Sequence, residues 1–314
     1  MSVHCVHNYE RSERLGASDL LGICAQRTNE DTSISLSYGR EPRVLAGQLR
    51  HDTRLVSVQL ANHETGVVQP IRDCGLRIAD GRAALHCDAT QAVGKMAVRF
   101  HELGVTTLSL SAHKFHGPKG AGALVVRRGT RLRPLLLGGH QQRERRPGTE
   151  PVALAVGLAT ALDLAARQMD ARHEAVTALR RRFLEHLLAH AAPVVLNGAD
   201  DGEGLPHTLN LSFVGVKADV LLMSLDLAGV ACSTGSACSS GSLLPSPVLQ
   251  AMGVAHDVLG SAMRFSLSFL LTEDEVDEAA RRVAEVVNRL RQDGASRSAG
   301  QHSSPNRAGS PKLP

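Results

Sequence analysis

The sequence of 314 residues contains no tryptophan and few other aromatic residues, with only two tyrosines and six phenylalanines. A hydrophobic core must therefore be built from leucine, valine and alanine, which the hydrophobic content of 43% allows. The six cysteines show neither the paired spacing of a zinc site nor the density of a secreted disulfide scaffold. No apolar run approaches the length of a membrane span, and no signal-peptide core precedes the first strand pattern. We therefore expect a globular protein of the reducing cytoplasm with no membrane partner.

An excess of charge of one sign is also missing, since 35 basic residues face 31 acidic ones and the net charge is +4. This balance gives no strong signal for nucleic acid, and basic clusters such as residues 143–146 are typical of solvated surfaces. Near the N-terminus, His4, Cys5 and His7 are too close together to form a tetrahedral metal site without ligands from elsewhere. We expect no metal.

Short apolar, β-branched segments alternate with longer amphipathic ones, which indicates an α/β fold. The pattern predicts strands at 53–60, 83–87, 105–110, 121–126, 194–196, 208–213 and 262–268, and helices at 71–80, 152–169, 171–190 and 218–227. A last helix is predicted from a capping-box sequence at 272–275 to about residue 292. Residues 1–40 show no clear period, and residues 294–314 are rich in Ser, Gly and Pro, which predicts a disordered tail.

Lys114 stands between the predicted strand at 105–110 and a Gly-Pro-Lys-Gly turn at 117–120. A lysine at such a strand end is partly desolvated, which disfavours its charged form and leaves a nucleophilic amine. Taken alone, the pattern also fits a surface lysine beside a turn.

Polar residues follow two other predicted strands, with His63 after 53–60 and the sequence Asp88-Ala-Thr-Gln91 after 83–87. Ligands of open α/β sheets bind outside the carboxyl ends of the strands, so these residues are candidates for a shared site. For Asp88 the alternative is a helix N-cap.

Cys238 lies in a run rich in Ser, Gly and Ala at 230–242, which we expect to be mobile and suited to carrying a nucleophile. Cys232 is more typical of a small buried residue. Arg264, on the predicted strand at 262–268, can bind a carboxylate bidentately; a structural ion pair is the alternative.

The sequence Ser111-x-His113-Lys114 before Gly-Pro-Lys-Gly, with Asp88-Ala-Thr-Gln91 and Gly235-Ser-Ala-Cys238, resembles the cysteine desulfurases. These are pyridoxal-phosphate (PLP) enzymes of the class V aminotransferase group and close relatives of selenocysteine lyase. The resemblance covers roughly residues 40–293. It implies fold type I, the aspartate-aminotransferase-like fold, with a mostly parallel sheet and a smaller C-terminal α/β domain. It divides the chain into an unmatched segment 1–40, an incomplete PLP-binding domain 41–191 and a small domain 192–293 with the mobile cysteine loop.

The resemblance also implies roles. Lys114 would carry PLP, Asp88 would face the pyridine nitrogen, and the remaining cofactor contacts would come from Gln91, His63, Ser111, His113 and, in the partner subunit's site, Thr149. Arg264 would bind the substrate carboxylate and Cys238 would accept sulfur from L-cysteine. The expected product is an enzyme persulfide that serves iron-sulfur cluster assembly or other sulfur transfer. A homodimer and a sulfur-acceptor or scaffold protein are the implied partners.

Two departures from the family pattern accompany this resemblance. The chain shows neither the Gly-Gly-Thr-Glu-like phosphate turn nor the ring-stacking Glu-His that precede the matched region, and His63 stands where the family has asparagine. Selenocysteine lyase remains the alternative enzyme. The alternative that is not an enzyme is a truncated, inactive relative that acts only as a binding partner.

Overall fold

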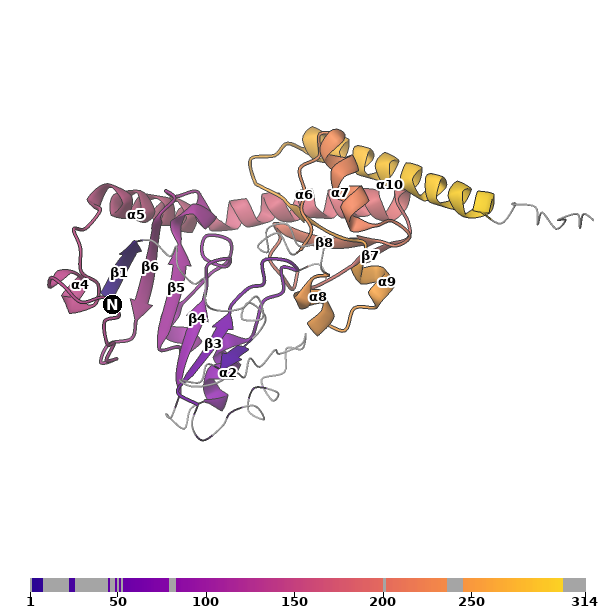
Figure 1. Ribbon diagram of the computed structural model, residues 1–314. Coiled ribbons are helices and arrows are strands. Elements are labelled where there is room, and N and C mark those ends of the chain that lie inside the picture. The colour runs from indigo at the N-terminus through magenta and orange to yellow at the C-terminus, as the bar shows by residue number, and fades with distance from the viewer. Residues whose placement is uncertain are drawn as a thin grey trace, which may run out of the picture.

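The computed structural model describes residues 45, 49, 51, 53–78, 83–199, 202–235 and 245–301, together with the backbone of 2–7 and 23–25. Side chains are not described at 2–7, 23–25 and 297–301, so the metal expectation at His4, Cys5 and His7 lies outside the described residues. Figure 1 shows a larger sheet and a smaller sheet, with α5 and α6 following one another along the same side of both.

The larger sheet has six strands in the order β1-β6-β5-β4-β3-β2. The strands are β1 (Ser2–His7), β2 (Ile23–Ala25), β3 (Leu55–Gln59), β4 (Ala84–Asp88), β5 (Thr107–Ser111) and β6 (Ala121–Val126). The inner strands β3, β4 and β5 are parallel, whereas β6, β1 and β2 pair antiparallel with their neighbours. The parallel centre agrees with the expected fold class, and β1 and β2 are additions that the sequence pattern did not predict.

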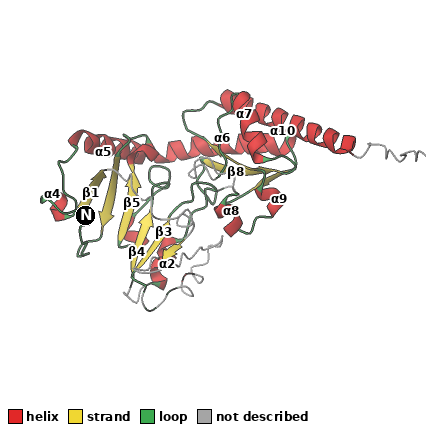
Figure 2. Ribbon diagram, in the orientation of Figure 1, coloured by secondary structure: helices red, strands yellow, loops and turns green. Residues whose placement is uncertain are grey.

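Each inner strand buries alternate side chains because successive residues point to opposite faces of a sheet. Val56 and Val58 of β3 and Leu85 and Cys87 of β4 are at most 3% exposed. The helices α2 (Ile71–Arg77), α3 (Phe100–Leu103) and α5 (Val152–Arg167) share one buried hydrophobic cluster with strands β3 to β6. The short helix α4 (Gln141–Glu144) stands apart at the outer edge of the sheet (Figure 2).

The smaller sheet is antiparallel, with the order β7-β8-β9. Its strands are β7 (Val194–Leu196), β8 (Thr208–Phe213) and β9 (Ala262–Ser266), and its helices are α6 (Met169–His190), α7 (Ala218–Leu227), α8 (Pro247–Ala251), α9 (His256–Leu259) and α10 (Glu273–Gln301). A second hydrophobic cluster joins the three strands with α6, α7 and α10, whereas Leu249 of α8 and Leu259 of α9 belong to a third, small cluster. The division of the chain into two domains, with a boundary at residues 191 and 192, remains a prediction.

The capping box predicted before the last helix is present. The Glu275 amide donates to Thr272 Oγ1 at 3.3 Å, and the Thr272 amide donates back to Glu275 Oε2 at 2.8 Å. However, α10 continues to Gln301, so the prediction of disorder is wrong for residues 294–301. Helix propagation adds one hydrogen bond for each residue fixed, and this outweighed the glycine and serine content there. Residues 302–314 lie outside the described part.

No single helix among the described residues is both long enough and apolar enough to cross a membrane. Only α5 and α6 taken together pass such a test, and they are bent by 70° at their junction.

Arg291 of α10 ties this helix to the end of α6. Its guanidinium donates to the carbonyl oxygens of Ala191, Ala192 and Pro193, each at 2.7 Å, and to that of Val214 at 3.1 Å. We expect Arg291→Met to lower the free energy of unfolding by about 1–3 kcal/mol, because it leaves several carbonyl groups without their charged donor. Denaturant unfolding measures this loss. The control is Arg289→Met on the exposed face of the same helix, and equal stability of the two variants would contradict the interpretation.

Candidate active site

The carboxyl ends of the three parallel strands lie level with one another. The Leu60 amide donates to the Asp88 carbonyl at 2.8 Å, and the Ala89 amide donates to the Ser109 carbonyl at 3.0 Å. The segments that follow β3, β4 and β5 therefore begin at the same edge of the sheet. The structure brings His63, Asp88 and Lys114 together at this edge, as the order of motifs in the sequence predicted.

Lys114 lies in η2, a short 3-10 helix (Ala112–Phe115) that directly follows β5. The buried side chains of Ala112 and Phe115 anchor this turn, which leaves Lys114 half-buried between them. The turn closes through the Gly117 amide, which donates to the Ala112 carbonyl at 2.9 Å. A Cβ at Gly117 would lie 2.9 Å from the Ala112 Cβ, so only glycine fits this close approach. The lysine is thus held at the strand end by tight packing.

Ser111 and His113 lie on the exposed side of the same turn. Ser111 Oγ and His113 Nδ1 are 2.8 Å apart, within hydrogen-bond distance. Burial and the positive charges of Lys114, Lys119 and Lys95 lower the pKa of His113. A neutral imidazole and a hydroxyl side by side, with lysine ammonium groups near them, are suited to an anionic group.

Asp88 lies at the end of a chain of hydrogen-bonded polar side chains on β4 and β5. The Thr90 amide donates to Asp88 Oδ1 at 2.9 Å, so the aspartate also caps the turn that follows it. Ser109 Oγ donates to the same oxygen at 3.4 Å and lies 3.3 Å from His86 Nε2. His86 Nδ1 in turn contacts Thr107 Oγ1 at 2.9 Å. Both hydrogen bonds within the described residues reach Oδ1, which leaves Oδ2 for a ligand.

His63, which follows β3 of the larger sheet, and Arg264, on β9 of the smaller sheet, face the same edge. Burial, followed by the charges of Arg264 and Lys114, lowers the pKa of His63 to about 4, while Asp88 opposes this shift. The ring is therefore neutral at physiological pH and can donate one hydrogen bond. The hydrogen bond from Arg264 Nη1 to the His63 carbonyl oxygen is long, at 3.5 Å, and therefore weak. The buried Nε of Arg264 has no partner among the described residues. No ion pair with a described carboxylate engages Arg264, which favours ligand binding over the structural alternative.

Glu64, which the sequence reasoning missed, is a buried carboxylate next to His63. It accepts a hydrogen bond from Ser246 Oγ at 2.6 Å, and Ser246 is the N-cap of α8. Gly235 packs directly against the same carboxylate, where a Cβ would overlap Glu64 Oε2. Residues 235 and 246 flank the segment 236–244, which contains Cys238 and lies outside the described residues. Glu64 therefore connects the segment after β3 to residues at both ends of the segment that contains the predicted nucleophile.

The second cysteine of this region is described. Cys232 is half-buried, and burial raises the pKa of its thiol to about 11. A thiol with this pKa is almost fully protonated at neutral pH and is a poor nucleophile. This agrees with the prediction that Cys232 is a packing residue.

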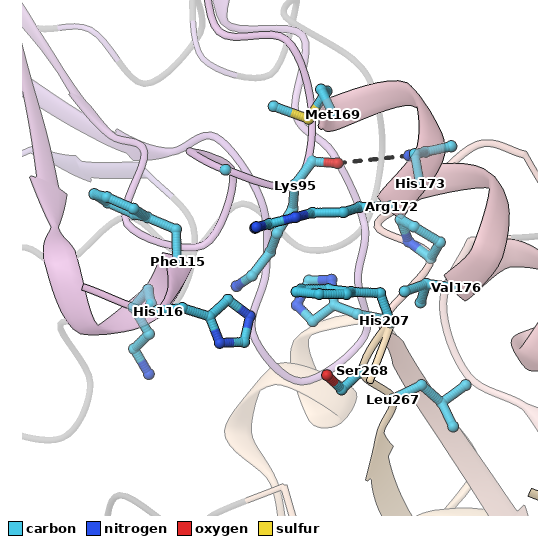
Figure 3. A pocket seen from close by; sticks show the side chains of 14 residues that line it. Lys95, Phe115, His116, Met169, Arg172, His173, Val176, His207, Leu267 and Ser268 are labelled. Carbon is cyan, nitrogen blue, oxygen red and sulfur yellow. Dashed lines mark hydrogen bonds between the residues drawn. The ribbon is translucent and has the colours of Figure 1, made fainter. Parts of the chain in front are cut away.

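A cavity of about 200 Å³ opens beside Lys114, between η2, the start of α6 and the segment that follows β9 (Figure 3). Lys95, Arg172 and His207 project into it, and no carboxylate is among its described lining residues. His207 Nδ1 is buried without a described partner, and burial lowers the pKa of this imidazole to about 3. Sequence reasoning missed Lys95 and His207, although Lys95 lies only four residues after Gln91 of the Asp88–Gln91 motif.

The remaining predicted residues are placed differently. Gln91 lies one turn after Asp88, and its amide oxygen accepts a hydrogen bond from Lys95 Nζ at 3.0 Å. Thr149 is exposed in the loop between α4 and α5. Among the described residues, no hydrogen bond connects Thr149 to the other predicted site residues. The prediction that Thr149 serves a second subunit's site is not tested within one chain.

The residues at this edge fit PLP. Asp88 offers a carboxylate oxygen for a protonated ring nitrogen, and Lys114 offers an amine from η2, which follows the neighbouring strand. The buried, unpaired Nε of Arg264 provides a positive group for a carboxylate.

Comparisons with known proteins agree with this geometry. The profile of the family described as Aminotransferase class-V matches residues 37–279. The chain is 44% identical to a cysteine desulfurase of Trichormus azollae over 277 residues, which are 87% of this chain and 69% of the relative. It is 40% identical to the cysteine desulfurase NifS of Azotobacter vinelandii, again over 87% and 69% of the two chains. The solved structure of a NifS-like protein superposes with a TM-score of 0.72 at 32% identity, covering 80% of this chain and 65% of that one.

The chain therefore belongs to the class V aminotransferase family, whose members of this type are PLP-dependent enzymes with an α/β fold. Within that family its relatives are cysteine desulfurases. The chain spans about two thirds of the length of these relatives.

The environment of Glu64 leads to a pH-dependent prediction. Burial raises the pKa of this carboxyl above its usual value of 4.5, so the folded protein binds its proton more tightly than the unfolded chain does. Its contribution to stability is therefore largest at low pH and decreases as the pH rises through the raised pKa. The variant Glu64→Gln keeps an acceptor for Ser246 but does not ionise. As the pH is raised from about 5 to about 8, we therefore expect the free energy of unfolding of Glu64→Gln to rise relative to that of the wild type. Urea unfolding at both pH values measures the difference.

The control for this experiment is Glu174→Gln, which removes an exposed carboxylate on α6. A Glu64→Gln difference that stays constant or falls over the same interval would contradict the interpretation.

Proposed function

We propose that this chain is a PLP-dependent cysteine desulfurase, which converts L-cysteine to L-alanine and retains the sulfur as a persulfide on Cys238. The observation that carries the proposal is the convergence of Lys114, Asp88 and Arg264 at one sheet edge, in the order that the desulfurase motifs require. The named relatives support the same activity.

Each residue has a defined task in this proposal. Lys114 supplies the amine that holds PLP, and Asp88 keeps a proton on the pyridine nitrogen through a charge-assisted hydrogen bond. When bound, PLP supplies an electron-accepting ring that stabilises negative charge at the α-carbon of the substrate. Gln91 and neutral His63 donate to the phenolic oxygen, while Ser111 and His113 bind the phosphate. Arg264 binds the carboxylate of cysteine and orients its side chain.

The sulfur transfer then depends on one thiol. The Cys238 thiolate attacks the sulfur of the substrate, an S–S bond forms and the bond between sulfur and the β-carbon breaks. The β-carbon takes up a proton, so L-cysteine and one enzyme thiol give L-alanine and one enzyme persulfide. A sulfur-acceptor or scaffold protein, such as one that assembles iron-sulfur clusters, then removes the sulfur. The compartment we propose is the cytoplasm.

We also propose that the enzyme is a homodimer. Leu135, Leu136 and Leu137 precede α4 and are 95%, 57% and 88% exposed, and Val152 and Val156 at the start of α5 are exposed as well. A contiguous run of exposed large apolar side chains is typical of an interaction surface. Thr149 lies in the same connection, so a second copy that covers these leucines would bring Thr149 to the partner's phosphate.

The two cysteines give a prediction on activity. We expect Cys238→Ser to bind PLP and cysteine but to release no sulfide in the presence of a reductant, because a serine hydroxyl stays protonated and attacks sulfur poorly. Cys232→Ser should retain most of the activity, since its thiol is protonated in the wild type. Sulfide and alanine release, measured together, test both variants. An active Cys238→Ser enzyme beside an inactive Cys232→Ser enzyme would identify Cys232 as the nucleophile instead.

The dimer gives a second prediction. In sedimentation at micromolar concentration we expect the wild type at about twice the chain mass of 33.4 kDa. The variant Leu135→Ser/Leu137→Ser should sediment as a monomer and bind PLP more weakly, because it loses both apolar contact and the partner's Thr149. The control is Leu270→Ser, which removes a leucine that is 70% exposed elsewhere on the surface. A wild-type monomer with full cofactor occupancy would rule the dimer out.

A further inference from the structure

Lys95 is a half-buried lysine. Within the described residues, its ammonium group makes one hydrogen bond, which goes to a predicted cofactor ligand. Its Nζ donates to Gln91 Oε1 at 3.0 Å. An ammonium group has no acceptor, so the oxygen of the Gln91 amide must face Lys95. The opposite end of the amide, the Nε2 group with its two protons, is then free to donate elsewhere.

The surroundings of Lys95 are unfavourable for a positive charge. Burial and the charge of Lys114 lower the pKa of Lys95 to about 8. Three histidines lie close enough for the charge of Lys95 to help lower the pKa of each imidazole: His113, His116 and His207. No described carboxylate forms an ion pair with it. At neutral pH the ammonium form still dominates, and Gln91 is its acceptor.

The backbone fixes the direction of this side chain. Gly94 has φ +82°, and a Cβ there would lie 2.4 Å from the Phe115 Cβ. The turn that carries Gln91 and Lys95 is thus packed against the residue next to Lys114. The Lys95 amide donates to the Ala92 carbonyl at 3.0 Å, which completes the turn. Figure 3 shows the Lys95 side chain between Arg172 and His116, on the way from the turn into the cavity.

We propose that Lys95 is a positioning residue, which fixes the amide of Gln91 so that its Nε2 group donates to the phenolic oxygen of PLP. This inference rests on the proposed function, in which Gln91 is a ligand of that oxygen. A positive charge on the acceptor side polarises the amide and strengthens the hydrogen bond that Nε2 donates. Lys95 acts through Gln91 and does not itself touch the cofactor.

The first test uses the near-visible absorbance of bound PLP as a function of pH. A hydrogen bond to the phenolic oxygen stabilises its deprotonated form, so weakening this bond raises the pH midpoint of the absorbance change. We expect Lys95→Met to raise the midpoint by about 0.7 pH unit, the effect of one modest hydrogen bond. Lys95→Arg, which keeps charge and donors, should stay near the wild type. The matched control is Lys119→Met, which removes an exposed lysine from the neighbouring turn.

A double-mutant cycle separates positioning from a direct effect of charge. In a Gln91→Ala background, Lys95→Met should shift the midpoint little further, because its route to the cofactor is already lost. A full additional shift in that background would overturn the proposal while leaving the enzyme assignment intact. A midpoint that does not change in Gln91→Ala would instead remove Gln91 from the proposed cofactor site, and the inference would fail with it.

A third measurement needs no cofactor. In the unloaded protein, carbon NMR of dimethylated lysines reports the pKa of Lys95, and Gln91→Ala should lower it because the charged form loses its acceptor. An unchanged pKa would show that the contact with Gln91 does not hold the ammonium group, which overturns the inference whether or not the protein binds PLP. If the proposed function fails but the inference does not, the wild type will show no near-visible absorbance after PLP is added, while the pKa of Lys95 will still depend on Gln91.

Discussion

The register of three parallel strands is the constraint on which the site depends. Because the segments after β3, β4 and β5 start level with one another, His63, Asp88 and Lys114 share one edge although the sequence separates them. A slip of one residue would turn Asp88 to the opposite face of the sheet. The alternate burial of apolar side chains on β3 and β4 makes such a slip unfavourable, so the stability of the sheet and the geometry of the site have one origin.

Positive charge at this edge exceeds what the described carboxylates neutralise. Lys114 and Arg264 act on both His63 and His207, and Lys95 acts on His207 as well, so burial and these cations keep the two imidazoles neutral. Such an arrangement raises the energy of the protein alone and is relieved by a ligand that carries negative charge, which binds the folded state and stabilises it. A phosphate-bearing cofactor and an amino-acid carboxylate both fit this requirement.

Much of the fold and of the site followed from the sequence. The β-branched runs gave the inner strands, and α7 agrees with its prediction from Ala218 to Leu227. The motif residues Asp88, Lys114 and Arg264 could be placed because each stands at a strand end or on a strand. Glu64 and His207 could not, since their roles come from burial and from contacts between segments far apart in the sequence, and no local pattern records these. Lys95 lies only four residues after Gln91, but a lysine at this spacing does not by itself indicate a contact with a cofactor ligand. The length of α10 was missed because glycine and serine content is a weak guide when a helix is already formed.

The central claim is that Lys114 is the amine that holds PLP. Its most direct test is to add PLP to the purified chain, fix the bound cofactor by borohydride reduction and locate the label by mass spectrometry of the peptides. The account predicts one label for each chain, on Lys114. A label on the neighbouring Lys95, whose lowered pKa also makes it a reactive amine, or spread evenly over exposed lysines, would contradict it.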